Sequence, residues 1–96
     1  MMEAMKVSLL FEAKMRLLLL KKRLVVKKMQ AAYKEAPSPE ALPYLAIAEE
    51  GVKRMDQAIQ AKDLAKMASS MSTVETAKEW FVEAQRRAVS ELTGKS

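Results

Sequence analysis

The sequence predicts an all-α fold: an antiparallel three-helix bundle with a short additional helix between the second and third helices. The 96 residues include only two glycines and three prolines. Good helix formers such as Ala, Leu, Met, Lys, Glu and Gln dominate, whereas β-branched and aromatic residues are too sparse for a sheet. A chain of this length provides one hydrophobic core, so we expect a single domain over residues 1–96.

The first helix is predicted over residues 3–35, a stretch that contains neither Gly nor Pro. Pro37 and Pro39 in "APSPEALP" end it, because proline lacks an N–H and disfavours helical geometry in the preceding residue. Ser38 is the expected N-cap of the second helix, over residues 39–61. Pro43 would remove an early backbone hydrogen bond, so residues 39–42 could instead form a separate turn.

The second helix has apolar residues three and four positions apart, which places them on one face. They are Leu45, Ala48, Val52, Met55 and Ile59. Gly51 costs about 1 kcal/mol relative to Ala inside a helix, which predicts the close approach of a neighbouring element. The segment "QAKDLAKM" is expected to break the helix, with Asp63 as a cap of the short helix over residues 63–71; one continuous helix with a change of phase is the alternative.

The third helix is predicted over residues 73–92, and "STVE" is typical of a capping box between Ser72 and Glu75. Its apolar stripe contains Val74, Ala77, Phe81, Ala84, Ala88 and Leu92, and Gly94 is the expected stop. Trp80 lies on the flank of this stripe. It suits either the edge of the core or an anchor in an interface.

The composition excludes several kinds of catalytic site. Cys and His are both absent, so the chain has no disulfide, no thiolate metal site and no histidine general base. The carboxylates lack the histidines of a di-metal helical bundle. The tail "TGKS" has Val89 where a phosphate-binding loop needs its first Gly. We therefore expect no enzymatic activity, no metal and no cofactor.

Targeting signals are absent from the expected positions. Glu3 and Glu12 lie where a signal peptide would need a basic and then an apolar region. The uncharged runs are shorter than the ~18–20 residues that cross a bilayer. We expect a soluble protein. Its expected location is the cytoplasm, or else the sequence leaves the location unspecified.

The first helix has two apolar faces when its residues are sorted by helical angle. A broad face is expected to meet the other helices, with Lys22 extending its ammonium to water. Its apolar members include Phe11, Met15, Leu18, Leu19, Val25, Val26 and Met29. A second face holds Leu10, Leu17, Leu20 and Leu24, with Lys14, Lys21 and Lys28 along one edge and Lys27 also at its rim.

Two hypotheses explain the second face. The first helix could lie between the others and bury both faces in one wider core. Alternatively, the face meets another chain, either a copy of this one in an antiparallel pair or a different protein with an acidic-rimmed apolar surface. We expect a non-catalytic protein-interaction module, with a homo-oligomeric structural protein and a basic nucleic-acid-associated protein as alternatives.

The charge distribution leads to the nucleic-acid alternative. Residues 1–36 carry nine Lys or Arg and three Glu, a net charge of +6, while residues 37–71 carry −1 and residues 72–96 carry zero. A basic segment suits acidic proteins, membranes or phosphates. Leucines rather than base-reading side chains separate the lysines, which disfavours nucleic acid. A membrane-surface helix is disfavoured because its opposite side is also apolar.

The chain also resembles de novo designed helical mini-proteins of the binder type. The resemblance depends on "SPEA" with Ser38 and Pro39, on the "STVE" segment, on Gly94 as a stop and on the lack of Cys and His. It implies a helical bundle that binds a partner through an apolar patch on one helix. The lysine-rich composition, the eight methionines and Gly51 depart from that pattern.

Overall fold

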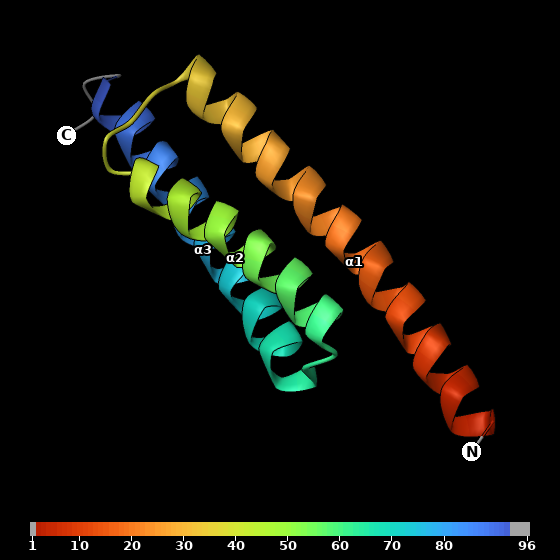
Figure 1. Ribbon diagram of the computed structural model, residues 1–96. Coiled ribbons are helices and arrows are strands. Elements are labelled where there is room, and N and C mark those ends of the chain that lie inside the picture. The colour runs from red at the N-terminus through yellow and green to blue at the C-terminus, as the bar shows by residue number, and fades with distance from the viewer. Residues whose placement is uncertain (1, 93–96) are drawn as a thin grey trace.

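The computed structural model describes residues 2–92, with side chains from residue 9 onward, and confirms the all-α class. It has three helices: α1 (Met2–Glu35), α2 (Leu42–Ala61) and α3 (Leu64–Leu92). The molecule is elongated, with extents of 64 × 18 × 17 Å, and α2 and α3 form a closely packed pair beside the longer α1 (Figure 1). The predicted stop at Gly94 and the "TGKS" tail lie outside the described residues.

Polar contacts fix the direction of α1 relative to the other helices. Arg23 lies 3.5 Å from the carboxylate of Asp56, and Gln30 donates to Glu49 at 2.8 Å, so α1 and α2 run in opposite directions. Lys22 pairs with Glu75, and Gln85 reaches the carbonyl of Ala32, so α1 and α3 run in the same direction. α1 therefore makes polar contacts with α2 on one side and with α3 on the other.

The second helix begins at Leu42 rather than at residue 39, and its N-cap is Ala41, not Ser38. Residues 38–41 form a turn in which the Ser38 carbonyl accepts from the amides of Ala41 and Leu42, at 3.0 and 3.2 Å. Pro43 occupies the first turn of α2, where its missing N–H is not needed. The separate turn that Pro43 suggested is thus the observed structure.

The predicted short helix over residues 63–71 does not exist as a separate element, because α3 runs without interruption from Leu64 to Leu92. The break before it is confirmed. Lys62 adopts a left-handed conformation with φ 57°, and the Asp63 carboxylate caps the new helix by accepting from the Lys66 amide at 3.1 Å. Ser72 lies inside α3, so the predicted capping box is wrong.

A buried serine, Ser70, lies on the inward face of α3 between Met67 and Val74. Met67, Ser70 and Val74 face inward and are three and four residues apart, so they belong to one stripe. A pattern of apolar residues alone omits Ser70. Its hydroxyl donates to the Lys66 carbonyl at 2.7 Å, which satisfies the group inside the core. One inward-facing stripe therefore continues past residue 72, and no new helix begins there.

The core consists of two clusters along the length of the molecule. One lies around Phe81, Val74 and Leu45, and the other around Met55, Ile59 and Met67. α1 contributes Met15, Leu19, Val26 and Met29 to these clusters, as its first apolar face predicted. A Cβ on Gly51 would lie 2.7 Å from Cγ2 of Val74, which confirms the predicted close approach.

Phe11 was expected in the core but is exposed. α1 has 34 residues and α2 has 20, so at 1.5 Å per residue α1 is about 20 Å longer. Its N-terminal end extends past the α2–α3 connection (Figure 1), and Met15 is the described residue nearest this end that is buried. The first apolar face is therefore covered along only part of its length.

Candidate interaction surface

The outward side of α1 carries four leucines that the described part of the chain leaves uncovered. We call Leu10, Leu17, Leu20 and Leu24 the leucine face. Their exposed fractions are 67%, 60%, 54% and 57%. Met15, Leu19, Val26 and Met29 on the opposite side of the same helix are buried. A single wider core that buries both faces of α1 is therefore wrong.

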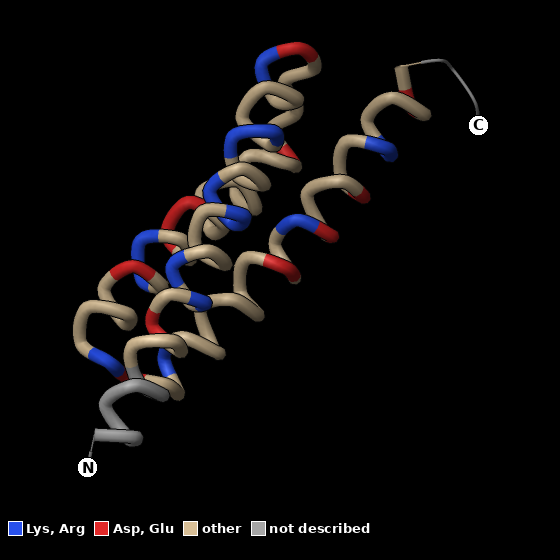
Figure 2. The backbone as a smooth tube through the Cα atoms, turned by 90° about the vertical axis from the view of Figure 1, so that its right-hand side faces the viewer, with Lys and Arg blue, Asp and Glu red and all other residues tan. Residues whose placement is uncertain are grey.

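Basic side chains border the leucine face on both edges. Lys14, Lys21 and Lys28 follow one edge, and Arg16, Arg23 and Lys27 follow the other; all six are exposed. Figure 2 shows how the basic residues recur along α1. Arg16 pairs with Glu12 at 3.2 Å and Arg23 with Asp56 at 3.5 Å. Among the described residues, none of the four lysines has a carboxylate within 4.0 Å, so their charges remain available.

Lys22 has a different role from the rim lysines. Its side chain is only 13% exposed, and its ammonium pairs with the Glu75 carboxylate on α3. The hydrogen bond and the charge of Lys22 lower the pKa of Glu75 below its ordinary value. The predicted extension of Lys22 out of the core therefore ends on a carboxylate, and the pair joins α1 to α3.

Trp80 lies on the other side of the molecule and is half-exposed. Its ring stacks on Tyr44 of α2, with centroids 6.3 Å apart and an angle of 22° between the planes. No sequence pattern indicates this contact, because the two residues come from different helices. The stacked pair covers the edge of the core between α2 and α3.

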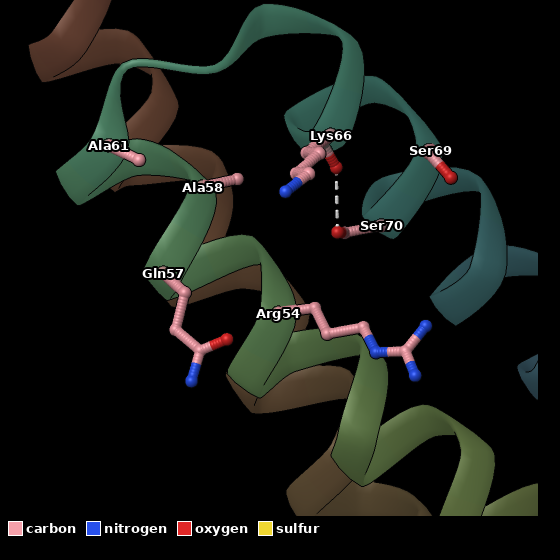
Figure 3. Close-up of a pocket in the computed structure, with 7 residues that line it drawn as sticks. All are labelled: Arg54, Gln57, Ala58, Ala61, Lys66, Ser69 and Ser70. Atoms are coloured by element: carbon pink, nitrogen blue, oxygen red, sulfur yellow. Dashed lines mark hydrogen bonds between the residues drawn. The ribbon is translucent and has the colours of Figure 1, made fainter.

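A shallow pocket of about 440 Å³ lies between α2 and α3, near their connection (Figure 3). Arg54 and Lys66 extend over it, while the hydroxyl of Ser70 is occupied by the Lys66 carbonyl. Each cation already has a carboxylate three or four residues before it, Glu50 at 3.4 Å for Arg54 and Asp63 at 4.0 Å for Lys66. The pocket therefore offers no free charge to a ligand.

Among the side chains described, residues 9–92, no three His, Cys, Asp or Glu residues are grouped closely enough to hold a metal ion. No helix in that range combines the length and the hydrophobicity of a membrane span.

Comparisons with known proteins give no relative for this chain: no family model, no curated protein and no solved structure matches it.

Proposed function

We propose that this protein is a non-catalytic interaction module that binds another protein through the leucine face and its basic rim. One observation carries the proposal: all four leucines are more than half exposed on a helix whose opposite side is buried. Exposed apolar patches of this kind, bordered by charge, mark binding surfaces. The resemblance to designed binders is consistent with this use of α1.

The charges favour a different protein over a second copy. Both edges of the leucine face are basic, so an antiparallel pair of α1 helices would place lysines beside lysines. A partner with acidic residues around an apolar stripe would instead neutralise Lys14, Lys21, Lys27 and Lys28. Self-association is therefore the second candidate, and nucleic-acid binding through the same lysines is the third.

The test uses a synthetic helical peptide with leucines at its a and d positions and glutamates at its e and g positions. Fluorescence anisotropy should show that it binds the wild-type protein and that raising the salt concentration weakens binding, because the rim charges are solvent-exposed. The variant Leu17→Glu/Leu24→Glu should bind at least about tenfold more weakly, because each substitution places a charge in the contact. A peptide with lysine at e and g should not bind.

The matched control is Ala46→Glu/Lys53→Gln, which makes the same change of net charge at two exposed positions on α2 and should bind as the wild type does. Circular dichroism must show that both double variants remain helical. If the leucine variant unfolds, or binds the acidic peptide as the wild type does, the proposal is wrong. Light scattering that detects a dimer, and its loss in the leucine variant, would favour self-association. Binding of generic duplex DNA at low salt would favour the third candidate.

A further inference from the structure

A second surface, which shares only Lys28 with the rim of the leucine face, lies between α1 and α3. It is a groove of about 280 Å³ with Met29 and Phe81 at its base and Val25, Ala32 and Val82 along its sides. Met29 and Phe81 are buried among protein atoms, while Val82 is exposed at the rim. The groove exists because α1 and α3 pack less closely than α2 and α3 do.

Polar contacts between the same two helices lie at both ends of this groove. One turn before Val25, Lys22 of α1 pairs with Glu75 of α3. At the other end, Gln85 donates to the carbonyls of Ala32 and Ala36, at 3.2 and 3.4 Å. The interval from residue 22 to residue 32 is about 15 Å at 1.5 Å per residue. The groove is thus a short apolar trough with a polar contact between the two helices near each of its ends.

Two ammonium groups line its open side, one from each helix: Lys28 of α1 and Lys78 of α3. In the described range of the chain, neither has a carboxylate within 4.0 Å. Lys78 is close enough to Glu75 for its charge to contribute to the lowered pKa of that carboxyl. A ligand with an apolar body and a negatively charged head would place its body on the apolar residues of the groove and its head beside the two ammonium groups.

We infer that the α1–α3 groove binds a single-chain aliphatic carboxylate of about the size of decanoate. Its alkyl chain lies along Val25, Ala32 and Val82, above the buried Met29 and Phe81, and its carboxylate lies between Lys28 and Lys78. The volume favours this ligand over a partner helix, whose diameter of about 10–12 Å exceeds what such a groove admits. It lies just below the usual range for drug-sized ligands, about 300–1,000 Å³, as expected for one short chain.

The test is a calorimetric titration of the wild-type protein with decanoate, at concentrations below those at which decanoate forms micelles. We expect one decanoate per chain, and a shift of the Met29 methyl resonance in the NMR spectrum. Lys78→Glu should weaken binding about tenfold, because it replaces a charge-assisted contact by repulsion. Val82→Glu, at an exposed rim position, should weaken it for the same reason. Decyltrimethylammonium, with the opposite head charge, should not bind.

Lys53→Glu, an equal change of charge on α2, is the matched control and should bind as the wild type does. The variant Leu17→Glu/Leu24→Glu should also retain decanoate binding, because the groove lies on the other side of the lysine edge; this separates the groove from the function proposed above. The inference is overturned if decanoate fails to bind, if Lys78→Glu and Lys53→Glu behave alike, or if the leucine variant abolishes binding.

Discussion

Replacing Gly51 by alanine should destabilise the protein, although the same change stabilises an ordinary exposed helix. An added Cβ would lie 2.7 Å from Cγ2 of Val74, nearer than real Cβ contacts allow. Val74 is fully buried, and its branched side chain has little rotational freedom. Overpacking of this kind costs about 1–3 kcal/mol, while the gain in helix propensity is about 1 kcal/mol. The net expectation is a loss of about 1 kcal/mol in the free energy of unfolding.

Urea denaturation followed by circular dichroism measures this difference, which corresponds to a decrease in Tm of about 4–8 °C for a domain of this size. Ala46→Gly, at an exposed position of the same helix, gives the propensity term alone and should cost about 1 kcal/mol. The double variant Gly51→Ala/Val74→Ala should be more stable than the sum of the single changes predicts, because the shortened side chain removes the clash. A Gly51→Ala protein more stable than the wild type would refute the close packing of α2 on α3.

Two further changes test the packing of α3. Glu75→Gln should lower the free energy of unfolding by up to about 1 kcal/mol at pH 7, because Lys22 then loses the negative charge of its half-exposed partner. Since Lys22 lowers the folded pKa of Glu75 below the ordinary value of 4.5, the stabilisation is present above that pH and is lost as the pH falls through the folded pKa. In urea titrations, the difference in the free energy of unfolding between the wild type and Glu75→Gln should therefore shrink from neutral to acidic pH. A difference independent of pH would contradict this. Phe81→Ala should cost about 3–5 kcal/mol because the side chain is 1% exposed. Val82→Ala, its exposed neighbour, should change the free energy of unfolding by less than about 0.5 kcal/mol, and similar losses for both would place Phe81 outside the core.

Local chemistry made much of this fold predictable. The prolines after Glu35 end α1, and the break between α2 and α3 coincides with Lys62 and Asp63. The three apolar stripes identified most of the buried residues, because helix periodicity alone decides which side chains share a face.

Two failures have a common physical origin. The capping box at Ser72 was wrong because its sequence pattern also occurs inside helices, where the amides are already bonded. Phe11 was placed in the core because periodicity gives the face of a residue but not how far the neighbouring helix extends. Both errors concern tertiary context, which local sequence does not encode.

The candidate surfaces were predictable to different degrees. The leucine face could be found from the sequence, since all its residues lie on one helix. The α1–α3 groove could not, because Met29 and Phe81, or Lys28 and Lys78, come together only when two distant helices pack. The Tyr44–Trp80 stack is hidden from the sequence for the same reason.

The leucine face alone is too small to hold a partner tightly. Full burial of a leucine contributes about 1.5–3 kcal/mol, and these four already have somewhat less than half of their surface covered, so each retains about 1–2 kcal/mol. The total of about 4–7 kcal/mol only matches the lower estimates of the free energy lost when two molecules associate, about 4–15 kcal/mol. A second copy would add repulsion between the basic edges to this balance, whereas an acidic partner would add attraction at four lysines. In the proposed complex, the charges of the rim therefore select the partner, and the leucines determine where on α1 it binds.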